Sequence, residues 1–142
     1  MDIKKILVPV DGSEASKHAL AYGVELAKAH QASLILLAVA DVTEAAYPIM
    51  GVTIDRDGFY NVKKKTEHML EEIKKTIPAD VELHAEVENG VPGNVISSMV
   101  ESNQVDMVIM GNSGKGAVSS FIMGSVSQYV IHHVTCPVLV VK

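Results

Sequence analysis

Four short apolar runs constrain the fold of this chain more than any other feature. They read ILVPV, SLILLAVA, MVIM and PVLVV, and they end at residues 10, 40, 110 and 141. Runs of this length without regular polar positions are typical of strands buried on both faces of a parallel sheet. Between them lie segments in which apolar residues recur every three or four positions, as in helices. The alternation predicts an α/β fold, an open doubly wound parallel sheet with helices on both faces.

A fifth strand is expected at residues 81–87 (VELHAEV), where apolar and polar residues alternate. Such alternation indicates a strand at a sheet edge or with one face in solvent. Pro9 should lie where the first strand ends, since proline cannot donate to a ladder. The last strand is expected to be buried, and also to form a sheet edge. Helices are predicted from Ser13, as a cap, to about residue 29, over 59–77, over 92–103 and from about residue 125, with a long loop at 41–58.

Composition limits the class of protein. A chain of 142 residues with 48% hydrophobic and 20% charged residues is predicted to form one ordered domain, residues 1–142. Its longest apolar run is too short to cross a bilayer, so no membrane partner is expected. A net charge of −5 argues against nucleic acid as a partner, because binding to phosphate backbones needs a basic surface. The lysines at 63–65 are interpreted as a solvated helix face. A single cysteine and no export signal predict a cytoplasmic protein.

The segment Gly111–Ser127 (GNSGKGAVSSFIMGSVS) holds four of the ten glycines and lies between an expected strand and an expected helix. A glycine and serine loop in this position is typical of an anion cradle. In open parallel sheets, ligands lie beyond the carboxyl ends of the strands. The turns after the first and second strands, at residues 9–11 and 39–41, are therefore expected beside this loop.

The spacing Gly111-x2-Gly114-x9-Gly124-Ser125, the opening KKILVPVDGS and the closing CPVLVV together resemble the universal stress protein family, in its ATP-binding branch. The resemblance covers the whole chain. It implies a fold like that of the adenine nucleotide alpha hydrolases and a bound ATP, or ADP or AMP, with Mg²⁺ brought in by the nucleotide.

The same resemblance implies a set of site residues. Asp11 and the backbone of Val39 would contact the adenosine part, with Pro9 and Val10 as the pocket wall. The ribose and the phosphates would lie along Gly111, Ser113, Gly114, Gly124, Ser125, Val126 and Ser127. Physical chemistry also supports phosphate contacts at residues 124–127. The first N–H groups of a helix have no partner within it, and the helix dipole attracts anions there.

Several of these residues have a second interpretation. Asp11 can simply shape a turn, Lys115 can reach the outer phosphates or stay in solvent, and Asn112 stands where relatives often differ. His132 and His133 are interpreted as contacts of a helix end rather than metal ligands. Cys136 is interpreted as a small buried hydrophobe rather than a nucleophile. The glycine pattern fits neither a P-loop nor a Rossmann fingerprint.

Two functions follow as alternatives. Phosphoryl transfer needs a positioned metal and groups that stabilise the transition state, and the glycine segment contains no Asp, Glu, Gln or Arg. The sequence therefore favours a nucleotide-binding regulatory module with no catalytic residues and no metal site of its own. The resemblance adds a homodimer formed through the C-terminal strand, and a protein partner that the sequence does not identify. The rival function is a slow ATPase or a phosphoryl- or adenylyl-transfer enzyme, in which Asp11 holds magnesium.

Overall fold

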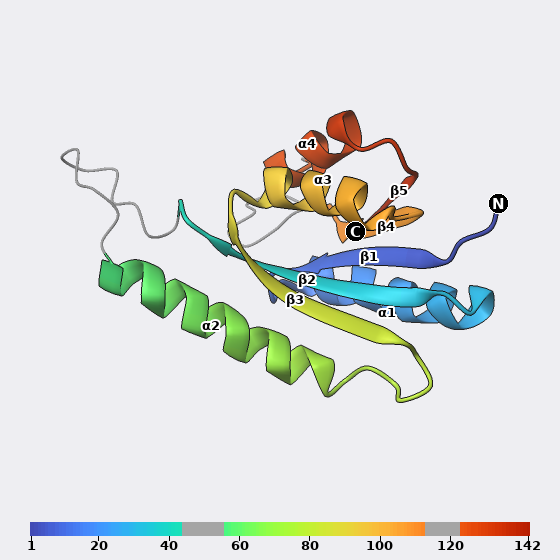
Figure 1. Ribbon diagram of the computed structural model, residues 1–142, viewed down its shortest axis with the longest axis horizontal. Helices are drawn as coiled ribbons and strands as arrows, with labels where there is room; N and C mark the ends of the chain where they lie inside the picture. The colour runs from blue at the N-terminus through green and yellow to red at the C-terminus, as the bar shows by residue number, and fades with distance from the viewer. Residues whose placement is uncertain (44–55, 113–122) are drawn as a thin grey trace.

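The computed structural model describes residues 1–43, 56–112 and 123–142, and a parallel sheet of five strands forms its centre. The strand order is β3-β2-β1-β4-β5. From the central β1, the chain adds β2 and β3 on one side and then returns to add β4 and β5 on the other (Figure 1). The order therefore reverses between β1 and β4, which confirms the doubly wound sheet. The strands are β1 (Lys5–Val10), β2 (Ser33–Asp41), β3 (Leu83–Gly90), β4 (Met107–Gly111) and β5 (Val138–Val141).

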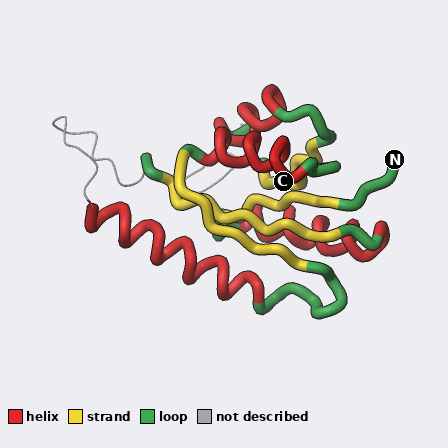
Figure 2. The backbone as a smooth tube through the Cα atoms, in the orientation of Figure 1, coloured by secondary structure: helices red, strands yellow, loops and turns green. Residues whose placement is uncertain are grey.

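Helices cover both faces of the sheet, as the sequence predicted (Figure 2). One face carries α1 and α2, and the other carries α3 and α4. Successive residues of β1 point to opposite faces, so Leu7 joins one apolar core while Ile6 and Val8 join the other. All three side chains are fully buried, as expected for a central parallel strand. The helices are α1 (Glu14–His30), α2 (Arg56–Lys74), α3 (Pro92–Asn103) and α4 (Ser125–His133).

Pro9 is the last residue but one of β1, within one residue of the predicted strand end. The carbonyl of Lys5 accepts from Asp106 on the β4 side, and the carbonyl of Lys4 accepts from Ser33 on the β2 side. The backbone N–H and C=O groups of even-numbered residues in β1 therefore point toward β2, and those of odd-numbered residues point toward β4. The missing N–H of Pro9 thus points toward β4, beyond Leu7, the last residue of β1 paired with that strand. Pro9 therefore removes no hydrogen bond between β1 and β4, because the two strands no longer pair at this position.

Some element boundaries differ from the prediction. Helix α2 begins at Arg56, so the last three residues of the expected loop are helical, while 44–55 lie outside the described residues. It ends at Lys74, and turns precede Pro78. Strand β3 runs to Gly90 and lies at the sheet edge, as its alternation indicated. Strand β5 also lies at an edge, and for that reason the expectation that it is buried was wrong: only Val141 is buried.

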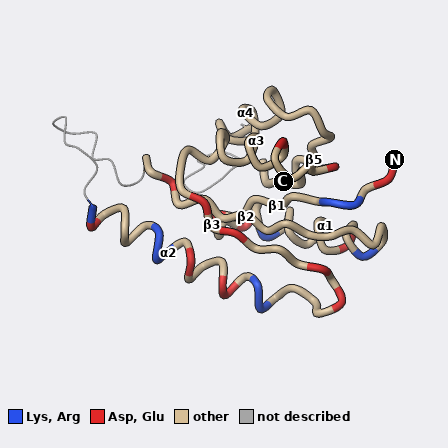
Figure 3. The backbone as a smooth tube through the Cα atoms, viewed as in Figure 1, with Lys and Arg blue, Asp and Glu red and all other residues tan. Residues whose placement is uncertain are grey.

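Charged residues of both signs recur along α2 (Figure 3), and most of them are exposed. Lys74 pairs with Glu71 at 3.1 Å and Lys75 with Glu72 at 2.9 Å. The residues of each pair are three positions apart in the sequence. No helix in the described ranges is long and apolar enough to cross a membrane.

Candidate functional site

A cavity of about 590 Å³ opens at the carboxyl ends of β1, β2 and β4, where the strand order reverses. Pro9 and Val10 line it from β1, Val39 from β2 and Gly111 from β4. Its other walls come from the first turn of α4, from α2 and from the start of α3. This is the position at which open α/β sheets bind their ligands.

Nine of the eleven site residues proposed from the sequence line this one cavity. Ser113 and Gly114 are the other two, and they lie outside the described residues, as does Lys115. The structure thus brings together turns that are far apart in the sequence, while the contact of each with a nucleotide stays a prediction. The nine are Pro9, Val10, Asp11, Val39, Gly111, Gly124, Ser125, Val126 and Ser127.

Hydrogen bonds join the two ends of the glycine segment at the base of the cavity. The N–H of Gly124 donates to the carbonyl of Asn112 at 2.7 Å, and the N–H of Asn112 donates to Val141 of β5 at 2.8 Å. The hydroxyl of Ser127 donates to the carbonyl of Gly111 at 2.8 Å. The end of β4 and the start of α4 are therefore held side by side, whatever lies between them.

The hydroxyl of Ser127 has a structural role. It has one proton, and that proton is donated to the carbonyl of Gly111. The side chain is also 2% exposed, against an exposed Ser125 two residues earlier. Of these two serines, Ser125 keeps a hydroxyl at the cavity that is open to a ligand, while Ser127 offers its backbone N–H.

The start of α4 carries N–H groups with no partner inside the helix. Gly124 is the N-cap, with an extended backbone at φ −64° and ψ 158°, and no side chain among the described residues caps the helix. The first intrahelical bond runs from Gln128 to Gly124, at 3.1 Å. The N–H groups of residues 125–127 are thus the unpaired donors of a helix N-terminus, and all three residues line the cavity. The positive end of the helix dipole lies at the cavity wall.

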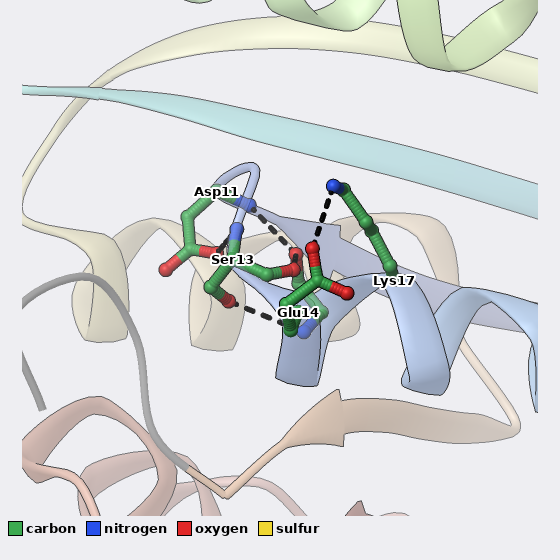
Figure 4. A network of polar contacts seen from close by, with 5 residues as sticks. Asp11, Ser13, Glu14 and Lys17 are labelled. Carbon is green, nitrogen blue, oxygen red and sulfur yellow. Dashed lines mark hydrogen bonds and ion pairs between the residues drawn. The ribbon is translucent and has the colours of Figure 1, made fainter.

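Asp11 shapes a turn, and it also lines the cavity. Its Oδ1 accepts from the N–H of Ser13 at 2.9 Å, and the hydroxyl of Ser13 accepts from the N–H of Ser16 at 3.2 Å as the cap of α1 (Figure 4). Between them Gly12 has φ +83°, a conformation that favours glycine. The turn interpretation of Asp11 is therefore confirmed, and its contact with a ligand remains a prediction. The adjacent Glu14 has its pKa lowered by the hydrogen bond from Lys17.

Gly111 is needed for a contact that the sequence did not reveal. A Cβ at this position would lie 2.8 Å from the Cβ of Ala15 and 2.9 Å from its carbonyl carbon. The close approach that this glycine permits is to the first turn of α1, and its contact with a ribose or a phosphate stays a prediction. This packing holds α1, the turn at Asp11 and the end of β4 together at the cavity.

Sequence reasoning missed the wall that α2 contributes. Val62, Thr66 and Met69 were not assigned to the site from the sequence, and Lys65 was assigned to a solvated face, yet all four line the cavity. The helical spacing 62, 65, 66, 69 was the available signal, because it puts Lys65 at the edge of the apolar stripe. The remaining lining residues that the sequence did not assign to the site are Gly12, Ser13, Ser16, Leu37, Asp41, Pro92, Ile96 and Met110.

The charged groups of the described lining are two carboxylates and one ammonium. Asp41 Oδ1 accepts from the N–H of Thr43 at 2.9 Å and from its hydroxyl at 2.6 Å, closing the turn after β2. Asp11 and Lys65 complete the set. In the described ranges, no three His, Cys, Asp or Glu residues lie together as a metal site would require.

Two further residues singled out from the sequence lie away from the cavity. His133 contacts the carbonyl of Tyr129 through Nδ1 at 2.7 Å and stacks on its ring, at the C-terminal end of α4, which confirms its interpretation as a helix-end histidine. Cys136 is partly rather than fully buried, and it packs against the core that α3 and α4 cover. Burial raises the pKa of its thiol, which suits a packing residue better than a nucleophile.

The comparison with known proteins settles the family. The model of the universal stress protein family matches residues 2–142. The chain belongs to the universal stress protein family. Among its relatives, universal stress protein MJ0531 of Methanocaldococcus jannaschii is 33% identical over 98% of this chain and 82% of its own length. Universal stress protein YxiE of Bacillus subtilis is 32% identical over 97% of this chain and 98% of its own.

Solved structures of universal stress proteins share the fold. That of UspA from Lactobacillus plantarum superposes with a TM-score of 0.84 at 26% identity, covering 100% of this chain and 99% of that one. A universal stress protein in complex with cAMP has a TM-score of 0.64 at 18% identity, over 100% and 98% of the two chains. One from Archaeoglobus fulgidus in complex with dAMP has 0.66 at 20% identity, over 100% of both. At these identities the last two show the common fold.

Proposed function

We propose that this chain is a cytoplasmic regulatory module of the stress response, a single universal stress protein domain that binds an adenine nucleotide at the cavity. The observation that carries the proposal is the start of α4, where the N–H groups of residues 125–127 have no partner within the helix and line the cavity at the reversal of strand order. A helix N-terminus in this position suits phosphate. Family members in complex with cAMP and dAMP, both adenine nucleotides, support the choice of ligand.

The walls of the cavity fit the parts of a nucleotide. Apolar side chains at the ends of β1 and β2, Val10 and Val39, offer a surface for a flat base. The cavity of about 590 Å³ lies within the range of small-molecule sites, roughly 300–1,000 Å³. ATP can accept more hydrogen bonds from the N–H groups at the start of α4 than ADP or AMP, because it carries the longest phosphate chain. ADP and AMP are the shorter alternatives. Mg²⁺ would come with the nucleotide, and the exposed hydroxyl of Ser125 fits it as an oxygen ligand.

Binding without rapid turnover is the favoured activity. The described lining offers Lys65, Asp11 and Asp41 as its charged groups, and the Oδ1 atoms of both aspartates accept hydrogen bonds that hold turns. Phosphoryl transfer needs a group that orients the attacking water and a cation on the transition state. We propose that nucleotide binding changes the glycine segment and so the choice of a protein partner. A phosphate-release assay tests the rival: turnover above about one per minute that is lost in Asp11→Ala would favour the enzyme.

Calorimetric titration of the folded protein with Mg-ATP tests the proposal. A heat of binding is expected, and its absence at millimolar ATP would overturn the proposal. Mass spectrometry of the nucleotide released from freshly purified protein then identifies the form bound in the cell, with ATP, ADP or AMP as the expected outcomes.

A proline at Ser125 tests the role of the helix start itself. Proline is well tolerated at the first position of a helix and has no N–H to donate. The extended backbone of Gly124 already suits a residue that precedes proline. Ser125→Pro should therefore leave the helix intact and weaken ATP binding about tenfold, the effect of losing a donor to a charged group. Ser125→Ala, which removes the hydroxyl alone, should lose less. An unchanged affinity in Ser125→Pro would contradict the placement of phosphate at this helix.

A further inference from the structure

Helix α2 brings one lysine to the cavity and directs its neighbours elsewhere. Lys65 lines the cavity from an exposed position. Lys64 instead lies over the ring of Tyr60, 5.0 Å from its centroid. Lys63 does not line the cavity. The run of three lysines is thus divided by helix geometry, since successive residues point about 100° apart.

Among the α2 residues at the cavity, Lys65 is the one with hydrogen-bond donors to spare. Val62 and Met69 are apolar, and the hydroxyl of Thr66 donates to the carbonyl of Val62 at 2.8 Å. In the described part of the chain, no carboxylate lies within ion-pair distance of the Lys65 ammonium. Its charge is therefore available to a ligand in the cavity.

Among the described residues, the other charges around the cavity are negative, so the positive charge of Lys65 matters for the binding of an anion. The described lining holds two carboxylates, Asp11 and Asp41, and the whole chain carries a net charge of −5. These carboxylates and the negative net charge repel an anion that approaches the cavity. A neutral ligand of the same shape meets no such repulsion. Lys65 is the lining cation, in the described ranges, that offsets these negative charges at the cavity mouth.

We propose that Lys65 is a specificity-determining residue that makes this cavity prefer a phosphorylated nucleoside over the nucleoside alone. The inference rests on the proposed function, because it concerns the same cavity and the same ligand class. It gives α2 a part in ligand recognition, beside the N–H groups at the start of α4. Thr66 and Met69 form the wall from which Lys65 projects, and Met69 lies against the turn at Gly12.

The test compares ATP with adenosine on a series of charges at one position. Calorimetry is done on the wild-type chain and on Lys65→Arg, Lys65→Gln and Lys65→Glu. Lys63→Gln is the matched control, because it makes the same change of net charge on the same helix away from the cavity. Lys65 is exposed, so each variant should fold, and circular dichroism with a thermal melt verifies this.

Lys65→Gln should weaken ATP binding about three- to tenfold, as expected for one partly solvated cation, and Lys65→Glu should weaken it further. Lys65→Arg should stay close to wild type. Adenosine affinity should change less than about twofold throughout, since adenosine carries no charge. Raising the salt concentration should reduce the difference in ATP affinity between wild type and Lys65→Gln.

Two results would overturn the inference while leaving the proposed function intact. One is an equal loss for ATP and adenosine in Lys65→Gln, which would mean that the residue only shapes the wall. The other is an equal loss of ATP affinity in Lys63→Gln, which would mean that net charge alone is responsible. If the wild-type protein binds neither ligand, the proposed function fails, and the inference fails with it.

Discussion

The hydroxyl of Ser127 donates to Gly111 from a buried position, while Ser125 is exposed on the same turn of α4. Ser127→Ala leaves the carbonyl of Gly111 without this donor, so the free energy of unfolding should fall by about 1–2 kcal/mol. Ser125→Ala should change it by less than about 0.5 kcal/mol, as exposed substitutions usually do. Urea unfolding measures both. Equal effects of the two substitutions would contradict the assignment of a structural role to Ser127.

The thiol of Cys136 gives a pH-dependent prediction at the same scale. Burial raises its pKa, so at any pH below that raised value the fraction of reactive thiolate is smaller than in the unfolded chain. Alkylation by iodoacetamide at pH 7.5 should be slower in the native protein than in urea, and its rate should rise with pH. A native rate equal to the unfolded rate would show that the thiol is not shielded.

At the scale of elements, the contact between β4 and α1 holds the cavity together. Gly111 lies against Ala15 so closely that a Cβ would meet a backbone carbon at 2.9 Å, and neither backbone atoms nor a short methyl group can move aside cheaply. Gly111→Ala should therefore lower the free energy of unfolding by about 1–3 kcal/mol through overpacking. Thermal unfolding followed by circular dichroism measures the loss. A melting temperature equal to that of wild type would contradict this packing.

The elements themselves were largely predictable from the sequence. Continuous apolar runs identified β1, β2 and β4, and the alternation in residues 81–87 indicated an edge strand, because burial on one or both faces dictates these patterns. The boundaries of α2 were harder to predict from the sequence. Its first turn contains Asp57 and Gly58, residues typical of loops, and packing of the rest of the helix against the sheet extends it through them.

The candidate site was predictable where it follows the strands and not where it depends on packing. Residues 9–11 and 124–127 could be assigned because strand ends and helix starts are visible in the sequence. The partner of the Ser127 hydroxyl and the neighbour of Gly111 could not, since both contacts join residues that are distant in the chain. Lys65 was missed because its neighbours in the sequence are charged and indicated a solvated face.

At the scale of the whole molecule, β5 bears on assembly, because its outer edge pairs with no other strand among the residues that the structure describes. The carbonyl of Pro137, just before β5, accepts from Val108 of β4, and the carbonyl of Val141 accepts from Asn112, just after β4. The backbone N–H and C=O groups of odd-numbered residues in β5 therefore point toward β4. The N–H of Val140 therefore points away from β4, toward the open edge. An unpaired apolar edge of this kind is suited to pairing with a second copy. We expect a homodimer formed through this strand.

Val140→Pro tests that expectation. It removes an N–H that faces the open edge and leaves the bonds between β4 and β5 in place. Light scattering should give a dimer mass for the wild type at micromolar concentration and a monomer mass for Val140→Pro. Val140→Thr, which keeps the N–H and the branched side chain, should remain dimeric. A monomeric wild type would contradict the proposed assembly.

In the proposed complex, an adenine nucleotide lies between the turns after β1 and β2 and the start of α4. The most direct test is a titration with Mg-ATP followed by the backbone amide resonances of the ¹⁵N-labelled protein. Gly124, Ser125, Val126 and Ser127 should show the largest shifts, with Asp11 and Val39 also affected, while the outer edge at Glu86 should stay unchanged. Binding that shifts other residues and leaves the first turn of α4 unperturbed would contradict this position of the nucleotide.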